Sequence, residues 1–532
     1  MASITSLTSE TDTGSEAAAP RDRAGTGPLG PRLATLVASA GAHGTNTICS
    51  PFDDTEIGRL PLSGDDDVEE AFRAARAAQA QWAAQPLSAR ATVFRRFAEL
   101  VIEEKSALLD VIQRETGKAR ASAFEEVADV SRWASHAAHS GPGYLRERRR
   151  AGAFPVLTRT SERHVPVGVV GIITPWNYPF TLPAGDAIPA LLAGNAVVLK
   201  PDSQTPHTAL FALELLHRAG LPRGLMQIIL GPGSRIGPAM IERADFMMFT
   251  GSTATGKAVA EGCAARLIGF SAELGGKNPM LVLADADTQR AAAGAVNACF
   301  SNSGQLCISI ERIYVHRDVW DEFVPAFLRR VNAMRLAGGL GWDADMGSLT
   351  GPDQLHKVSS HVSDAVERGA TVLAGGRARP DLGPWFHEPT VLTDVLPDMA
   401  VAREETFGPV VSLYRVDSDE EAIAAANDTE YGLNASVWSR RRGPAVARRL
   451  QAGTVNINEG YAAAWASNAS PMGGMKASGM GRRHGAEGFR KFTEPQSIAT
   501  QRLVPVGGPP GLGHERWSRI LSAGVRLLNR FN

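Results

Sequence analysis

The chain has 532 residues, of which 55 are Lys or Arg and 56 are Asp or Glu, so its formal net charge is −1. A balanced charge lacks the basic excess that attracts nucleic acid or anionic membranes, so neither is expected as a general partner. The length and the hydrophobic fraction of 44% are typical of a folded protein of two to four domains, which excludes disorder throughout. Glycine is over-represented at 54 residues, about 10% where about 7% is usual, and this indicates close backbone approaches.

The N-terminal residues 1–30 are rich in Ser, Thr, Ala, Gly and Pro and lack the charged and apolar regions of a secretion signal. We therefore predict a disordered tail there. The four cysteines are too few and too scattered for a disulfide framework, which favours a reducing compartment. The sequence has no uninterrupted apolar run of about 18 residues. Together these features predict a cytoplasmic protein.

Residues 65–137 carry apolar side chains at helical spacings of three and four, and they predict a bundle of helices. From Val165 the pattern changes to short apolar runs separated by helix-like stretches. These runs are Val167 to Thr174, Ala196 to Leu199, Met226 to Leu230 and Phe246 to Phe249. Such repetition predicts a doubly wound parallel sheet of the nucleotide-binding type. A second α/β region is expected from about Lys277, with strand-like runs at 280–282, 313–315 and 410–413.

The last segment, 514–532, is predicted to form an amphipathic helix. One side is apolar, with Trp517, Ile520, Leu521, Val525, Leu528 and Phe531, whereas the arginines Arg516, Arg519, Arg526 and Arg530 lie mostly on the other. Two interpretations stay open. The helix docks on the protein's own surface or on a neighbouring subunit, or it makes a peripheral contact with an anionic membrane.

The segment from Phe300 to Cys307 places a thiol shortly after Gly304, where the backbone can come close to a ligand and the sulfur can stay accessible. A lone cysteine is more often a small buried hydrophobic residue, which is our prediction for Cys263 and Cys299.

Three further segments carry candidate polar groups. Glu273 precedes a glycine pair among apolar neighbours, and burial would raise its pKa toward that of a general base. Asn177 lies in an irregular turn after a predicted buried strand, where its amide could donate to a developing oxyanion. Glu405 could bind a ribose diol beside the aromatic ring of Phe407.

Together these four segments resemble the aldehyde dehydrogenase superfamily, and the likeness extends from about Asp65 to Thr500. Further motifs in family order are Val198 to Pro201, Phe249 to Ser252, Asn427 to Leu433 and Pro471 to Gly479. The resemblance implies an α/β fold with a Rossmann-type NAD(P)-binding domain, an α/β catalytic domain and a small β oligomerisation arm. The implied NAD(P)-binding domain comprises residues 31–143 and 164–275, and the implied catalytic domain comprises residues 276–485. The implied arm comprises residues 144–163 and 486–505. The arm would join a homodimer or a homotetramer.

The resemblance also implies catalytic roles. Cys307 would attack the aldehyde, and the Asn177 side chain with the backbone N–H of Cys307 would hold the oxyanion. Glu273 would activate the water that hydrolyses the thioester, and its presence favours hydrolysis over transfer to coenzyme A. An inactive structural relative is the non-enzyme alternative, which the retained residues disfavour.

The implied cofactor-binding residues are Trp176, Lys200, Ser203, Gly251, Ser252, Glu405 and Phe407. Many NAD-preferring members carry Glu three residues after the lysine, where it repels a 2′-phosphate. Because this chain has Ser203 there, we predict NADP as the cofactor, with NAD possible. No metal is expected, since His136 and His139 have no third ligand nearby in sequence.

Within the superfamily the sequence is most similar to bacterial succinate-semialdehyde dehydrogenases, so the small-molecule substrate expected is succinate semialdehyde. Better-known members hold its carboxylate with two arginines, but Ser301 and Gly185 occupy those positions here. Another cation must therefore substitute, or the substrate differs. The predicted substrate-binding residues are Phe180, Ser301, Tyr461 and Trp465. Their aromatic rings would also suit apolar aliphatic or aromatic aldehydes, which is the alternative.

A second departure from the family pattern concerns two charged positions. Many relatives have Lys nine residues after the oxyanion Asn and Glu after the Gly-Arg of the C-terminal motif. Here these positions hold Asp186 and Arg483. We predict a reversed ion pair near the deacylation water channel, and the alternative is two unrelated surface changes.

Overall fold

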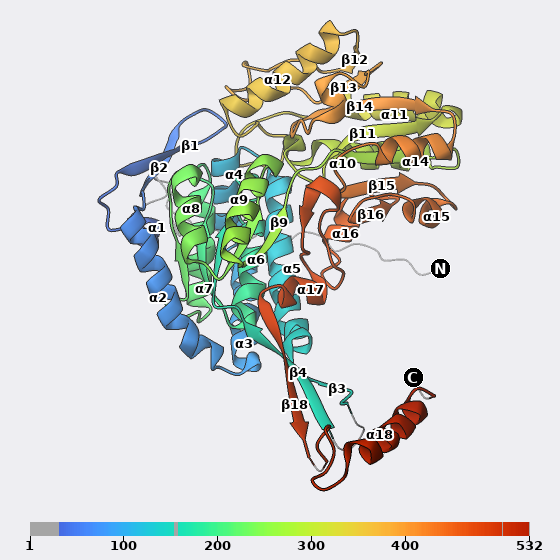
Figure 1. The fold of residues 1–532 in the computed structure, drawn as a ribbon. Coiled ribbons are helices and arrows are strands. Elements are labelled where there is room, and N and C mark those ends of the chain that lie inside the picture. Colours follow the sequence, from blue (N-terminus) through green and yellow to red (C-terminus); the bar gives the residue numbers. More distant parts are fainter. Residues whose placement is uncertain (1–30, 154–157, 503, 531–532) are drawn as a thin grey trace, which may run out of the picture.

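The computed structural model describes residues 31–153, 158–502 and 504–530 (Figure 1). The predicted tail 1–30 lies outside the described residues. The described chain begins with the short helix α1 (Pro31–Ala34) and an antiparallel pair, β1 (Thr45–Cys49) and β2 (Glu56–Pro61), which the sequence analysis did not predict. The predicted helical region then forms α2 (Asp65–Ala83), α3 (Leu87–Glu103), α4 (Lys105–Thr116) and α5 (Arg120–Leu145).

Local signals set the ends of these helices. Asp67 in the first turn of α2 accepts a hydrogen bond from the backbone N–H of Gly64, which satisfies one of the free donors at that end. Helix α4 ends where Gly117 adopts a left-handed conformation with φ 71°. The apolar faces of α3 and α5 pack together, and α5 also contacts α6 (Thr181–Ala193). Helix α5 thus packs against α6, the helix that follows the first strand of the six-stranded sheet.

That sheet has six strands in the order β17-β9-β8-β5-β6-β7. The strands are β5 (Val169–Ile173), β6 (Ala196–Lys200), β7 (Met226–Ile228), β8 (Phe246–Thr250), β9 (Gly269–Glu273) and β17 (Gly479–Met480). All neighbours are parallel except β17 with β9. The connecting helices are α6, α7 (Pro206–Arg218), α8 (Gly233–Arg243) and α9 (Thr253–Arg266). Strands β5 and β8 are neighbours although they are far apart in sequence, so the chain reverses its direction of progress across the sheet at this point.

A second sheet has seven strands in the order β12-β13-β14-β11-β10-β15-β16. Its strands are β10 (Asn278–Val282), β11 (Ile310–His316), β12 (Thr371–Ala374), β13 (Thr390–Thr393), β14 (Val410–Val416), β15 (Asn434–Trp438) and β16 (Thr454–Ile457). Its helices are α10 (Thr288–Phe300), α11 (Arg317–Asn332), α12 (Pro352–Glu367), α13 (Ala400–Arg403), α14 (Asp419–Asn427), α15 (Gly443–Ala447) and α16 (Ala462–Trp465). Helix α17 (Gly485–Arg490) returns to pack against α5 and α6. The predicted α/β class with parallel sheets is confirmed, whereas the domain boundaries stay a prediction.

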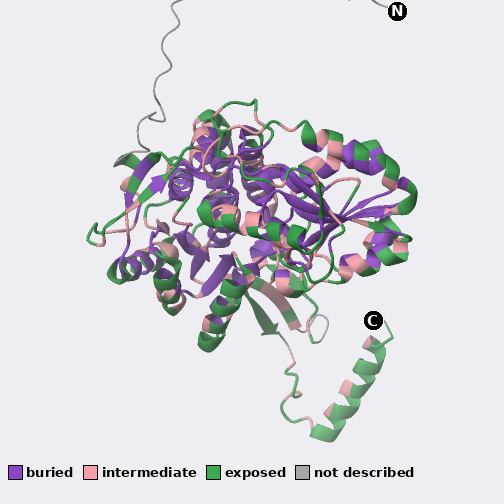
Figure 2. Cartoon of the chain, turned by 90° about the horizontal axis from the view of Figure 1, so that it is seen from above, coloured by how far each residue is buried: buried purple, intermediate pink, exposed green. Residues whose placement is uncertain are grey.

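A third, small sheet extends from the body in the order β18-β4-β3. Strands β3 (Arg148–Arg150), β4 (Thr158–Pro166) and β18 (Thr493–Gln501) pair antiparallel, in the segments predicted to form the arm. Helix α18 (His514–Leu528) follows and stands clear of the body (Figure 2). It has no buried residue, and Trp517 Nε1 donates to the carbonyl of Val506 in the preceding segment. The structure thus contradicts docking of α18 on the protein's own surface. Within the described ranges, no helix is both long and apolar enough to cross a membrane.

Candidate active site

The candidate site lies at the carboxyl ends of the parallel strands of the six-stranded sheet. Trp176 and Asn177 follow β5, and Thr250, Gly251 and Ser252 end or follow the neighbouring strand β8. Ligands of doubly wound sheets bind where the strand order reverses, because two adjacent loops diverge there and leave a crevice. The structure has a cavity of about 190 Å³ at this place, lined by Trp176, Asn177, Gly251, Ser252, Glu273, Cys307, Glu405, Phe407 and neighbouring residues. We call it the cofactor cavity.

The residues around the cofactor cavity fit a dinucleotide. Ser252 caps the N-terminus of α9, where its side chain accepts from the N–H of Thr255. The side-chain ammonium of Lys200, at the end of β6, has no hydrogen bond or ion pair among the described residues, and a Cβ on Gly233 would lie 4.0 Å from its Nζ. This ammonium thus lies beside the N-terminus of α8, and both features favour phosphate. Burial lowers the pKa of Lys200, against the opposing charge of Asp202.

Glu405 enters the cofactor cavity from the second α/β region. Its Oε1 accepts from the backbone N–H of Gly276 at 2.8 Å, and burial raises its pKa to about 7. A Cβ on Gly275 would lie 2.6 Å from Glu405 Oε2, so only glycine leaves room for the carboxylate there. The rings of Trp176 and Phe407 lie edge to face at 5.5 Å. Lys200 and Ser203 do not line this cavity, and Ser203 instead accepts through its carbonyl from Asn46 Nδ2.

A second cavity of about 230 Å³ meets the first at the thiol. Cys307, Asn177 and Leu182 line both cavities. The second, which we call the substrate cavity, is otherwise lined by Tyr461 and Trp465, whose contact with substrate stays a prediction, and by Glu125, Ala128, Asp129, Arg132, Tyr178, Thr181, Leu306, Ile308, Ala462, Ala466 and Asn468. Its volume exceeds the roughly 30 Å³ of a water molecule several times over. A small aldehyde in it would reach the sulfur from the side opposite the cofactor cavity.

Two of the predicted substrate-binding residues do not line this cavity. Phe180 has no exposed surface, belongs to the hydrophobic core and is not among the residues that line the cavity. The prediction that Phe180 contacts the substrate is therefore wrong. Ser301 lies behind the cavity wall, with its Oγ 3.4 Å from Glu125 Oε2. The sequence analysis missed Glu125, Asp129 and Arg132, since helical spacing shows which face of α5 is polar but not that it borders a cavity.

The loop before the nucleophile is held in an unusual conformation. Asn302, Ser303 and Gly304 all have positive φ, of 51°, 56° and 70°. Such values are uncommon outside glycine and persist where the surroundings enforce them. At Gly304 a Cβ would lie 2.1 Å from the carbonyl oxygen of Gly408. The turn therefore requires glycine there, and it presents Cys307 three residues later.

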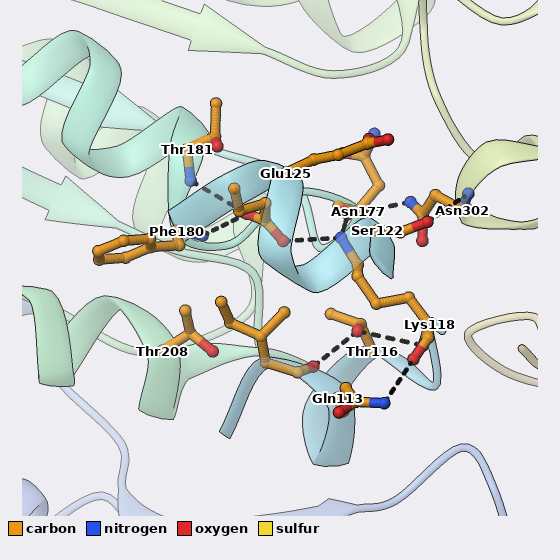
Figure 3. A network of polar contacts seen from close by, with 12 residues as sticks. Gln113, Thr116, Lys118, Ser122, Glu125, Asn177, Phe180, Thr181, Thr208 and Asn302 are labelled. Carbon is orange, nitrogen blue, oxygen red and sulfur yellow. Dashed lines mark hydrogen bonds and ion pairs between the residues drawn. The ribbon is translucent and has the colours of Figure 1, made fainter. Parts of the chain in front are cut away.

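A buried network positions Asn177 (Figure 3). Lys118 Nζ and Asn302 Nδ2 both donate to the backbone carbonyl of Asn177, at 2.8 and 3.2 Å. Lys118 also pairs with Glu126 at 2.7 Å, and neither side chain has any exposed surface. Asn177 Nδ2 donates to the carbonyl of Gln305 at 3.0 Å, which leaves its second N–H free for an oxyanion.

The two predicted reactive side chains lie in low-dielectric surroundings. Burial raises the pKa of Cys307 to about 12, against the opposing positive charge of Arg483. Burial likewise raises the pKa of Glu273 to about 7, again against Arg483. Both Glu273 oxygens are buried without a hydrogen-bond partner among the described residues. A carboxylate in this state can accept a proton near neutral pH. Cys263 and Cys299 are buried, as predicted.

The predicted reversed ion pair is confirmed. Arg483 binds Asp186 through two hydrogen bonds, Nη2 to Oδ2 at 2.6 Å and Nε to Oδ1 at 3.1 Å, and both side chains are buried. Arg483 Nη2 also donates to Thr250 Oγ1 at 2.5 Å, which links the pair to the end of β8. Lys491 Nζ lies 3.7 Å from Asp186 Oδ1. The alternative of two unrelated surface changes is therefore wrong, while the position near a water channel stays a prediction.

Comparison with known proteins agrees with this geometry. The model of the "Aldehyde dehydrogenase family" matches residues 37–498. A protein of Mycolicibacterium smegmatis named "putative succinate-semialdehyde dehydrogenase, NADP(+)" is 53% identical over 94% of this chain and 97% of its own length. A glutarate-semialdehyde dehydrogenase of Pseudomonas putida is 36% identical over 85% of this chain and 93% of its own. The crystal structure of succinate-semialdehyde dehydrogenase from Burkholderia pseudomallei has a TM-score of 0.83 and 35% identity, covering 86% of this chain and 95% of that one.

The fold, with a cysteine thiol between two cavities, is that of an NAD(P)-linked oxidoreductase acting on aldehydes. The chain belongs to the aldehyde dehydrogenase family.

Proposed function

We propose that this protein oxidises succinate semialdehyde to succinate with NADP, through covalent attack by Cys307. The observation that carries the proposal is the shared position of Cys307 and Asn177, which line both the cofactor cavity and the substrate cavity. A thiol at this junction can bind an aldehyde on one side while a hydride leaves toward the other. The names of the relatives support the choice of substrate and cofactor.

The protein's residues act in two half-reactions. The Cys307 thiol loses its proton to water, aided by the charge of Arg483, and the sulfur attacks the aldehyde carbon, whose C=O π electrons pass to the oxygen. The free N–H of Asn177 Nδ2 and the backbone N–H of Cys307 stabilise the resulting oxyanion. NADP, when bound, supplies the hydride acceptor. Glu273 then takes a proton from the water that hydrolyses the thioester on Cys307, and succinate leaves.

Lys200, Ser203, Gly251 and Ser252 would hold the phosphates and adenosine ribose, with Trp176, Glu405 and Phe407 at the nicotinamide end. Support comes from the unpaired ammonium of Lys200 beside the start of α8, and from the absence of a carboxylate at position 203 that would repel a 2′-phosphate.

Initial rates with a panel of aldehydes test the proposed substrate. We expect kcat/KM for succinate semialdehyde to exceed that for hexanal and benzaldehyde by at least about tenfold, or about 1.4 kcal/mol. The aliphatic and aromatic side chains in the wall of the substrate cavity, such as Leu306, Tyr461 and Trp465, favour the second candidate, oxidation of uncharged aldehydes. A higher kcat/KM for hexanal or benzaldehyde would replace the first proposal by this one.

The assembly and location are also proposals. We propose a cytoplasmic homodimer or homotetramer joined through the β3-β4-β18 sheet, and the four free cysteines support a reducing compartment. Helix α18 then contacts a neighbouring subunit or an anionic membrane, since its apolar side chains, such as Ile520 at 55% exposure, face solvent in the single chain. Light scattering and liposome flotation, with and without residues after Gly513, separate these possibilities. Loss of assembly supports the subunit contact, and loss of flotation supports the membrane contact.

A further inference from the structure

Arg132 stands apart from the other charged residues of the substrate cavity. The described cavity lining contains three charged side chains, Glu125, Asp129 and Arg132, and Arg132 is the only cation among them. All three come from one face of α5, at successive spacings of four and three. The family pattern would supply arginines at positions 185 and 301, where this chain has Gly185 and Ser301. The cavity therefore carries its positive charge on a different element.

The guanidinium of Arg132 is available to a ligand. Across the described ranges it forms no ion pair, and its one hydrogen bond is a long one, from Nη2 to the carbonyl of Ala466 at 3.4 Å. Asp129 lies one turn away on α5 but not within ion-pair distance of it. An arginine without a carboxylate partner presents a planar set of N–H donors, which binds a carboxylate through two parallel hydrogen bonds.

Arg132 lies at the mouth of the substrate cavity. It also lines a shallow hollow on the outer surface, together with Ala466 and Asn468, and these three residues are common to the hollow and the cavity. Asn468 Oδ1 is buried without a hydrogen-bond partner in the described chain, so a further polar group faces this region. Cys307 lines the same cavity and also the cofactor cavity beyond it. The reactive sulfur and the free guanidinium therefore face a common space.

The two acids do not make this space a site for a cation. Glu125 is engaged by hydroxyl groups, from Tyr461 at 3.3 Å and from Ser301 at 3.4 Å. Burial raises the pKa of Glu125, and it raises the pKa of Asp129 to about 7, so the Asp129 carboxyl is only partly ionised near neutral pH. The guanidinium, by contrast, stays charged at all such pH values.

We propose that Arg132 binds the distal carboxylate of the substrate and thereby selects short aldehydes with a terminal carboxylate. This inference rests on the proposed function and supplies the cation that its substrate needs. The aldehyde end meets Cys307 and Asn177, the hydrocarbon chain lies along the apolar wall, and the carboxylate reaches Arg132. Arg132 is thus a specificity residue and takes no part in bond making.

The test is the ratio of kcat/KM for succinate semialdehyde to that for butanal, which lacks the carboxylate. Arg132→Gln should lower this ratio about 10- to 100-fold, the value of hydrogen bonds to a charged group. Arg132→Lys keeps the charge but loses the paired N–H donors, so it should restore part of the ratio. Arg329→Gln, at an exposed position on α11, is the matched control and should keep the wild-type ratio. If Arg132→Gln does not fold, Arg132→Met serves in its place.

The outcomes separate this inference from the proposed function. The role of Arg132 would be overturned if Arg132→Gln kept the ratio within twofold of wild type, or if the Gln and Lys variants lost the ratio equally. Either result would leave succinate semialdehyde as the proposed substrate. A wild-type enzyme that prefers butanal would overturn the substrate itself. Preference of the wild type for 4-aminobutanal over succinate semialdehyde would assign the cavity to a cation through Glu125 and Asp129, and would overturn both.

Discussion

The two cavities that meet at Cys307 are built in different ways. The cofactor cavity is formed by loops that leave the ends of parallel strands, and glycines allow the main chain to come close to a ligand there. The substrate cavity is walled by side chains from α5 and α16, which are more than 300 residues apart in sequence. Loops with family motifs thus form much of the cofactor cavity, whereas helix side chains from distant segments form much of the wall of the substrate cavity.

This difference predicts two kinds of variant. Changes at the cofactor cavity should affect every aldehyde alike, whereas changes at the substrate cavity should discriminate between aldehydes, as described for Arg132.

The largest effect is expected from Glu273→Gln. Steady-state oxidation of every aldehyde should fall by about 10²- to 10³-fold, because the amide cannot take a proton from the hydrolytic water. The first turnover should persist as a burst of NADPH. Stopped-flow absorbance measures both phases, and Glu367→Gln on the exposed surface of α12 is the control. A normal rate of deacylation in Glu273→Gln would remove its assigned role.

The pH profile of the wild type follows from the same group. Because the pKa of Glu273 is raised to about 7, the carboxylate is protonated below that pH and cannot act as a base. The rate of deacylation should therefore rise as the pH increases through about 7 and then level off. Glu273→Gln should lack this rise, and a variant that keeps it would assign the titration to another group.

Most of the predicted residues of the cofactor cavity were accessible to sequence reasoning because they belong to short contiguous motifs, whereas Gln354 and Lys357 on α12 were not predicted. The predicted strands at 196–199 and 246–249 correspond to β6 and β8. Glu273 ends β9 of the same sheet, and Cys307 lies between β10 and β11 of the second sheet. The β1-β2 pair was missed because β1 is mostly exposed and the two short strands lack a strong apolar pattern. Phe180 was misassigned because the direction of a side chain at the start of a buried helix depends on packing.

An intermediate effect is expected at the ion pair behind the cofactor cavity. Asp186→Asn leaves Arg483 buried without its partner, which should cost about 3 kcal/mol of unfolding free energy. A double-mutant cycle with Arg483→Gln, measured by denaturant unfolding, should give a clear coupling energy. The exposed pair Arg335 and Asp345 is the control and should couple by less than about 1 kcal/mol. Coupling near zero for Asp186 and Arg483 would contradict a paired role.

The pH dependence of this stabilisation has a definite sign. Burial acts to raise the pKa of Asp186, but the charges of Arg483 and Lys491 outweigh it and lower the pKa. The stabilisation by the Asp186 ion pair should therefore be complete above a pH of about 4, which is the usual pKa of Asp in an unfolded chain. It should be lost as the pH falls through the lower pKa that Asp186 has in the folded protein. The Asp186→Asn variant should lack this acid-dependent loss.

The smallest effect is expected at Ser203. Ser203→Glu introduces a carboxylate three residues after Lys200, and it should lower kcat/KM for NADP relative to NAD by about tenfold through repulsion of the 2′-phosphate. The ratio between aldehydes should not change, since position 203 lies away from the substrate cavity. Unchanged use of NADP in this variant would show that the 2′-phosphate binds elsewhere.

The central claim is that Cys307 forms the covalent intermediate at the junction of the two cavities. Intact-protein mass spectrometry of Glu273→Gln, mixed with succinate semialdehyde and NADP, tests it most directly. The account predicts one succinyl group per chain, located by peptide mapping on the peptide that contains Cys307. No adduct, or an adduct on the exposed Cys49 instead, would contradict it.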